Sequence, residues 1–166
     1  ALRVARSYGE VGTDRVATIV VGNFAAGKST FIKKLAVGTR AAVVDADQVK
    51  SYIPFYEDGY NTGATGAESS AIRWKVRDAL MRKGENIVIE HVGDNPSSVI
   101  KSKTEMEEEG YTVTVVHVKV EPHEATRRAT RRFIETGRYI EPNATRRVVE
   151  KELVTAAFNS LVAKGE

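Results

Sequence analysis

A nine-residue segment at positions 22–30 constrains the fold more than any other feature of the sequence. It reads GNFAAGKST, which matches the phosphate-binding pattern G-x-x-x-x-G-K-[S/T]. A short apolar run rich in β-branched residues precedes it at 16–21, and apolar residues at helical spacing follow it. A glycine-rich loop between a buried strand and a helix is the context in which this pattern binds a nucleoside triphosphate. The sequence therefore predicts a P-loop protein.

Each residue type in the loop has a chemical reason. Glycines let the backbone wrap around a phosphate with its N–H groups pointing inward. Lys28 is a cation able to bridge the β- and γ-phosphates, Ser29 offers a hydroxyl to Mg²⁺, and the following helix presents its positive end to the anion. We therefore expect ATP and Mg²⁺ to be bound by the whole loop: Gly22, Asn23, Phe24, Ala25, Ala26, Gly27, Lys28, Ser29 and Thr30.

The composition is that of one ordinary globular domain. The 166 residues are 42% hydrophobic and 28% charged, with a net charge of +3. The absence of cysteine excludes disulfides and thiolate metal sites. No apolar run approaches the roughly 18–20 residues that span a bilayer, and the first residues lack the apolar stretch of a signal peptide. We expect a cytoplasmic protein with no membrane partner.

Apolar runs alternate with helical patterns along the chain. We expect strands at 16–21, 41–44, 86–90 and 111–120, and helices after the loop and at 68–83, 95–109, 122–136 and 143–163. This alternation predicts a single domain over 1–166 with the three-layer α/β/α P-loop NTPase fold and a mostly parallel sheet. The sheet has one strand fewer than P-loop kinases usually have. Either the last strand is missing, or residues 1–15, which otherwise suggest a turn or a loose N-terminal segment, form an edge.

Three acidic residues follow expected strands at their carboxyl ends, where a parallel sheet binds its ligands. Asp47 stands where a kinase needs a base to orient and deprotonate the acceptor hydroxyl. Glu90 ends an apolar strand like a Walker B acid and is suited to hold Mg²⁺ through its waters. Asp45 either assists Mg²⁺ or caps the next helix. For all three, the structural alternative is helix capping or pairing with arginines.

Arginines gather between residues 127 and 147. Arg127, Arg128, Arg131 and Arg132 form two i,i+4 pairs of like charge, whose repulsion phosphates would offset. A glycine- and proline-containing connection and a further helix follow, with Arg138, Arg146 and Arg147. We expect residues 127–147 to form a lid over the nucleotide whose arginines stabilise charge on the transferring phosphoryl group. The alternative is a solvated basic face.

Two more residues are candidate substrate contacts. Glu68 begins a helix after a glycine-containing loop, and it either reaches the substrate or favours its own helix N-terminus. His91 follows Glu90 toward the ligand crevice.

Together these segments resemble the zeta toxins over residues 16 to about 155. The likeness rests on the P-loop, Val43-Val44-Asp45-Ala46-Asp47 followed by Tyr52-Ile53-Pro54, Glu68-Ser69-Ser70, Val88-Ile89-Glu90, and the arginine-rich segment up to Pro142. The resemblance implies an ATP- and Mg²⁺-dependent kinase that phosphorylates UDP-N-acetylglucosamine and is neutralised by an antitoxin.

The resemblance also implies roles for individual residues. Asp47 matches the family's catalytic aspartate, Lys28 its P-loop lysine, and Arg132 and Arg138 its phosphate-facing arginines, with Arg138 needing a shorter connection than in the long toxins. The sequence departs from the family at His91, where glycine is usual. A helix acid that binds sugar in the long toxins has no clean counterpart here. Trp74 falls near it, and Glu68 is the nearest acid.

The leading interpretation is a kinase acting on a small molecule. A polynucleotide 5′-hydroxyl kinase shares the P-loop, the aspartate after the second strand and the lid arginines, but no aromatic platform for stacking bases accompanies the basic segment. Nucleic acid is therefore not the expected partner, although it stays open. A regulatory module that binds a nucleotide without catalysis is the third interpretation, and Asp47 argues against it because binding alone needs no base.

Overall fold

The computed structural model of the chain describes residues 1–22, 25–50, 66–92, 95–136 and 159. Its centre is a sheet with strand order β2-β3-β1-β4 in which all neighbouring strands run parallel. The strands of this described part are β1 (Val16–Gly22), β2 (Ala42–Val44), β3 (Ile87–His91) and β4 (Thr112–Val118). The predicted parallel sheet is confirmed, with bounds within two residues of those expected.

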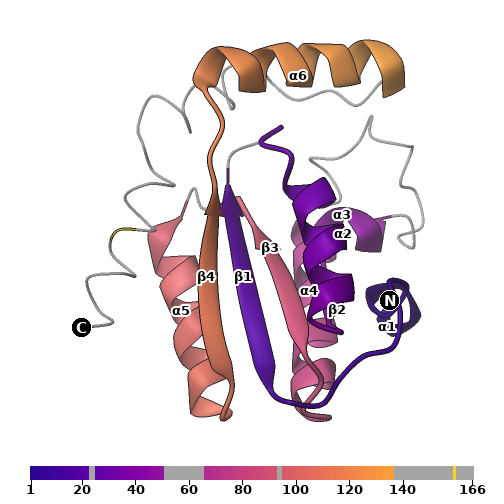
Figure 1. The fold of residues 1–166 in the computed structure, drawn as a ribbon, viewed down its shortest axis with the longest axis vertical. Helices are drawn as coiled ribbons and strands as arrows, with labels where there is room; N and C mark the ends of the chain where they lie inside the picture. Colours follow the sequence, from indigo (N-terminus) through magenta and orange to yellow (C-terminus); the bar gives the residue numbers. More distant parts are fainter. Residues whose placement is uncertain (23–24, 51–65, 93–94, 137–158, 160–166) are drawn as a thin grey trace.

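Helices cover both faces of the sheet (Figure 1). On one face, Ile32 and Ala36 of α2 (Lys28–Gly38) pack against Val20, Val43 and Val88. On the other face, α4 (Gly66–Met81) and α5 (Pro96–Glu108) pack through residues that include Leu80 and Met106. The three layers predicted from the sequence are therefore present.

Apart from Thr18, the central strand β1 is apolar along its length, which suits a strand covered on both faces. Every residue of β1 after Val16 is buried, which is the burial expected of an inner parallel strand. β4 lies at the edge of the described sheet, and its residues are exposed or half-buried rather than buried. The sheet thus presents its inner strands, β1 and β3, to both helical layers.

Local sequence signals explain where α5 begins and ends. The Asn95 side chain accepts a hydrogen bond from the Ser98 N–H at 3.3 Å, and Pro96 occupies the first helical turn, where its missing N–H costs nothing. Past the end of the helix, Gly110 has a φ of 80°, a left-handed conformation that glycine adopts without strain.

The N-terminal segment is not an edge of the described sheet, so that expectation is wrong, whereas the expected turn is present at residues 6–8. It contains the helix α1 (Leu2–Ala5), and Ala5 belongs to the same buried cluster as Leu80 and Ile87. Arg6 forms an ion pair with Glu85, with 2.6 Å between Nη2 and Oε1. A helix of four residues is too short to show hydrophobic periodicity, which is why the sequence pattern did not reveal it.

Two further helices border the carboxyl end of the sheet. α3 (Ala46–Lys50) begins directly after β2, and α6 (Pro122–Thr136) follows β4 and carries the arginine cluster. Figure 1 shows α6 crossing beyond the end at which β1 and β4 finish. The expected helix at 143–163 and the lid residues from 137 onward lie outside the described residues, apart from residue 159. Among the described helices, none has the length and apolar character to cross a bilayer.

Candidate functional site

A cleft of about 320 Å³ lies where β2, β3 and the start of α2 meet. Four residues predicted for the site line it together: Ser29, Asp47, Glu90 and Arg132. The remaining lining residues are Tyr8, Ile32, Lys33, Asp45 and Gln48. The sheet, α3 and α6 thus bring residues more than 100 positions apart to one place.

The phosphate-binding loop has the backbone that its glycines predict. Gly27, at the start of α2, has a φ of 87°, which is accessible to glycine without strain. A Cβ at Gly22 would lie 2.7 Å from the carbonyl oxygen of Val118, so the close approach of β4 excludes any side chain there. Ala26 is buried, whereas Ser29 and Thr30 are exposed at the first turn of α2. Asn23 and Phe24 lie outside the described residues.

Lys28 is buried between the loop and β3. Its Nζ donates a hydrogen bond to the carbonyl oxygen of Gly22 at 2.7 Å and lies 3.3 Å from Oε1 of Glu90. Burial lowers the pKa of Lys28, and the neighbouring Glu90 carboxylate opposes this shift by favouring the charged ammonium. The lysine is therefore positioned by Glu90, the residue that we expected to act near Mg²⁺.

Asp47 is placed by the first turn of α3. The Asp45 carboxylate accepts a hydrogen bond from the Asp47 N–H at 2.8 Å, which is the capping role left open for Asp45. Oδ1 of Asp47 forms an ion pair with Nζ of Lys50 at 3.1 Å, and Lys50 itself is buried. The carboxylate of Asp47 is therefore tethered at the cleft by a buried cation.

The arginines of α6 divide between acids of their own helix and the cleft. The Glu124 carboxylate accepts hydrogen bonds from Nε of Arg127 and from Nε of Arg128, both at 2.7 Å. Nε of Arg131 donates a hydrogen bond to Oε1 of Glu135 at 2.7 Å. Hydrogen bonds from Arg127 and then Arg128 lower the pKa of Glu124 to about 2. Glu124 and Glu135, on the same helix, thus offset part of the repulsion between the arginines, so phosphates are not its sole compensation.

Two of these arginines face the nucleotide loop. Nη1 of Arg128 lies 3.5 Å from the place where a Cβ would stand on Gly27, and Arg132, one turn later, lines the cleft. The positive end of α2, Lys28 and these two arginines surround the loop with cationic charge, an arrangement that suits phosphate groups. Arg138 lies outside the described residues.

Two predicted substrate residues do not line the cleft. His91 lies on the opposite face of β3 from Glu90 because successive residues of a strand point to opposite faces. Its side chain is buried, and its ring centroid lies 5.7 Å from that of Trp74. Burial, followed by the charges of Arg73 and Arg77, lowers the pKa of His91 to about 3. Glu68 is exposed in the first turn of α4 and is also not among the lining residues.

The structure adds two residues that the sequence patterns did not identify. Nε2 of Gln48 donates a hydrogen bond to the Tyr8 hydroxyl at 2.6 Å, and both residues line the cleft. Gln48 was detectable in principle because it follows Asp47 directly. Tyr8 carried no local signal, since only the folding of the N-terminal segment against α3 brings it there.

Comparison with known proteins agrees with this geometry. The profile of the family described as Zeta toxin matches residues 5–164. A comparison with curated protein sequences gave no significant match.

Two solved structures share the fold. One comes from a study described as "Molecular and structural characterization of the PezAT chromosomal toxin-antitoxin system of the human pathogen Streptococcus pneumoniae", with a TM-score of 0.71 at 20% identity. The alignment covers 81% of this chain and 59% of that one, so the chain spans about three fifths of that relative. The other, from Chloroflexus aurantiacus, is described as "a putative kinase" and has a TM-score of 0.65 at 17% identity, covering 83% and 76% of the two chains. Since the family profile extends over nearly the whole sequence and the fold is that of P-loop kinases, the chain belongs to the zeta toxin family.

Proposed function

We propose that this protein is an ATP-dependent kinase that transfers the γ-phosphate to a hydroxyl group of a small metabolite. One observation carries the proposal: Asp47 lines the same cleft as Ser29, Glu90 and Arg132, beside the phosphate-binding loop. A protein that only binds a nucleotide needs the loop but has no use for a tethered carboxylate facing it.

The nucleotide end of the cleft is built from the loop and α6. Backbone N–H groups at the start of α2 and the Lys28 ammonium bind the β- and γ-phosphates, with Arg128 over Gly27 and Arg132 in the cleft. Among the described residues, no three His, Cys, Asp or Glu side chains are grouped to hold a metal ion unaided. This fits Mg²⁺, which is usually held by one or two protein groups together with substrate phosphates and water. Ser29 and Glu90 are those groups in our proposal, and the ion neutralises phosphate charge when bound.

The acceptor end is built around Asp47. Its carboxylate orients the acceptor hydroxyl and takes its proton as the oxygen attacks the γ-phosphorus, while ADP departs in line. Lys50 holds Oδ1 of Asp47 at 3.1 Å, which restricts the carboxylate to an orientation facing the cleft. Tyr8 and Gln48 shape the adjoining wall through their mutual hydrogen bond.

A nucleotide sugar such as UDP-N-acetylglucosamine is the acceptor that we favour. Support comes from membership of the zeta toxin family. The Streptococcus pneumoniae relative belongs to a toxin-antitoxin system, and we extend to this chain the expectation of an antitoxin protein as partner.

The decisive experiment supplies the protein with ATP, Mg²⁺ and an acceptor, and detects a phosphate gain by mass spectrometry. UDP-N-acetylglucosamine, a 5′-hydroxyl oligonucleotide and a cell metabolite extract form three separate arms. We expect product with the nucleotide sugar, and a loss of at least about a hundredfold in kcat for Asp47→Asn and for Lys28→Ala. Lys103→Met, which removes a half-buried cation of α5 that pairs with Glu107, serves as the control and retains activity.

Each alternative has its own outcome in this experiment. Phosphorylation of the oligonucleotide alone makes the protein a polynucleotide kinase. ATP binding with no product in any arm leaves a regulatory nucleotide-binding module. Full turnover by Asp47→Asn contradicts the role assigned to that carboxylate.

A further inference from the structure

Tyr8 lies on the side of the cleft that carries Asp47. In the strand order β2-β3-β1-β4, β3 separates β2 from β1, the strand that leads into the phosphate-binding loop. Tyr8 reaches the cleft from the β2 side, where its hydroxyl accepts a hydrogen bond from Nε2 of Gln48 in α3 at 2.6 Å. Gln48 directly follows Asp47, and all three residues line the cleft. The phenol is therefore a neighbour of the proposed base.

The phenol ring is held by packing as well as by this hydrogen bond. Tyr8 is half-buried and packs against the apolar cluster that contains Val20, Ile32 and Ala36. Because the core fixes the ring and Gln48 fixes the oxygen, the hydroxyl has little conformational freedom left to lose when a ligand binds. A preorganised group of this kind binds a ligand more tightly than a mobile side chain that offers the same hydrogen bond.

The Tyr8 hydroxyl has one hydrogen-bonding function left. A phenolic O–H can both accept and donate, and the Gln48 amide uses its accepting side. Within the part of the chain that the structure describes, no group accepts the proton of this hydroxyl. The carboxylates nearby have other contacts, since Asp45 caps α3 and Asp47 pairs with Lys50. The proton is therefore available to a molecule bound in the cleft.

We infer that Tyr8, positioned by Gln48, determines specificity by donating a hydrogen bond to an oxygen of the acceptor next to the hydroxyl that Asp47 deprotonates. The inference rests on the proposed function, because it takes Asp47 as the base. One contact at the reactive hydroxyl and a second at a neighbouring oxygen together fix the orientation of the acceptor. The cleft thus favours acceptors with several oxygens, such as sugars, over monohydric alcohols, which would leave the phenol unpaired.

Calorimetric titration of UDP-N-acetylglucosamine measures this contact without requiring turnover. The protein is first saturated with Mg²⁺ and a non-hydrolysable ATP analogue, so that the loop is occupied and the nucleotide sugar is confined to the acceptor side. We expect Tyr8→Phe to raise the Kd of the nucleotide sugar by about tenfold, because it removes one hydrogen bond and keeps the ring packing. The Kd of the ATP analogue itself should change by less than about twofold.

Tyr111→Phe is a matched control, since it deletes the same hydroxyl from a tyrosine remote from the cleft. Tyr111 precedes β4 at the amino end of the sheet, and its hydroxyl donates a hydrogen bond to the carbonyl oxygen of Glu85 at 2.9 Å. The control should lower the melting temperature, because it leaves a buried carbonyl unpaired, and should leave the Kd of the nucleotide sugar unchanged. Tyr8→Phe should show the opposite pattern, with a raised Kd and little change in melting temperature.

A double-mutant cycle tests the role given to Gln48. Gln48→Met removes the amide that holds the Tyr8 hydroxyl, and we expect it to raise the Kd by about threefold, less than Tyr8→Phe does. The two substitutions together should raise the Kd no further than Tyr8→Phe alone, because Gln48 acts through the phenol. Effects that multiply would contradict this positioning role.

The outcomes separate this inference from the kinase proposal. A Kd that Tyr8→Phe leaves unchanged, or that Tyr111→Phe raises equally, overturns the inference even where phosphoryl transfer is observed. The absence of any binding of UDP-N-acetylglucosamine to the loaded protein overturns it as well. Binding that depends on Tyr8 but yields no phosphorylated product supports the contact and counts against the kinase proposal instead.

Discussion

The contrast between Glu90 and His91 shows how one position along a strand changes a side chain's surroundings. Glu90 reaches the cleft and pairs with Lys28, whereas His91 is enclosed between β3 and α4 beside Trp74. Enclosure among apolar groups and near two guanidinium groups penalises the protonated imidazole, which accounts for the pKa of about 3. His91 is therefore a neutral packing residue in the folded protein.

We predict that His91 makes the protein sensitive to acid. Above pH 6.5 the imidazole is neutral in both the folded and the unfolded chain and contributes no pH dependence. Between pH 6.5 and about 3 the unfolded chain binds a proton that the folded one refuses, so the free energy of unfolding falls as pH falls. The expected contribution is about 1.4 kcal/mol per pH unit within that window.

Urea unfolding of the full chain and of His91→Phe at pH 7, 6, 5 and 4 measures this contribution. The variant is expected to lose stability less steeply with acid than the parent. Parallel curves for the two proteins would show that His91 is not enclosed as described.

Among the elements, α6 does the most to turn a nucleotide-binding loop into a candidate phosphotransfer site. It follows β4 and passes beyond the carboxyl end of the sheet (Figure 1), and Arg128 on it lies against Gly27 of the loop. Two adjacent arginines on it differ in their surroundings. Arg127 is exposed and bonds to Glu124, while Arg128 shares Glu124 and also lies against Gly27.

This difference predicts unequal effects of matched substitutions. Arg128→Gln removes a cation beside the phosphate loop, and we expect it to lower kcat/KM for ATP by about a hundredfold. Arg127→Gln breaks an exposed pair of the kind that contributes little, so kcat/KM should change by less than about threefold. Steady-state kinetics of ATP consumption compares the two, and equal effects would contradict the placement of Arg128 over the loop.

At the level of the whole molecule, the N-terminal segment joins the core to the cleft. Ala5 packs with Leu80 and Ile87, Arg6 pairs with Glu85, and Tyr8 reaches the cleft to bond with Gln48. A segment that carries no motif thus contributes both to the stability of the domain and to a wall of the site.

Removal of residues 1–9 is expected to affect both properties. The truncated chain exposes the cluster around Ala5 and leaves Glu85, which is nearly buried, without Arg6, so its melting temperature should fall by several degrees. Tyr8→Phe keeps the packing and deletes only the hydroxyl, so it should change kcat or KM with little change in melting temperature. Calorimetry and kinetics on both proteins test this, and a truncated chain as stable as its parent would mean that α1 does not pack on the core in solution.

Much of the architecture was predictable because its signals are local. The apolar β-branched runs and the glycines of residues 22–30 depend on near neighbours along the chain, so the parallel sheet and the loop–helix junction could be inferred directly. The carboxyl ends of parallel strands meet at one edge, and this rule alone places Asp47 and Glu90 near the loop. The structure groups them with Ser29 and Arg132 in one cleft.

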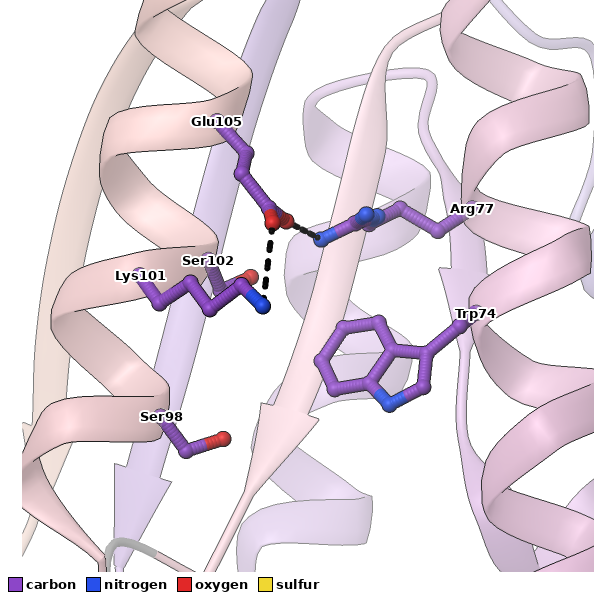
Figure 2. A pocket seen from close by; sticks show the side chains of 6 residues that line it. All are labelled: Trp74, Arg77, Ser98, Lys101, Ser102 and Glu105. Carbon is purple, nitrogen blue, oxygen red and sulfur yellow. Dashed lines mark hydrogen bonds and ion pairs between the residues drawn. The ribbon is translucent and has the colours of Figure 1, made fainter.

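The sequence by itself determined the fold class, the nucleotide loop and the acids at the strand ends, because these follow from periodicity and from conformations that only particular residue types adopt. Only the tertiary structure decided which face of β3 carries His91, that Lys50 tethers Asp47, and that Tyr8 enters the site. It alone revealed the cavity between α4 and α5, which Trp74 and Glu105 help to line (Figure 2). These features depend on which elements lie side by side, and packing between distant segments leaves no periodic trace in the chain. The P-loop can therefore be recognised in the sequence, whereas the residues that surround it are brought there only by folding.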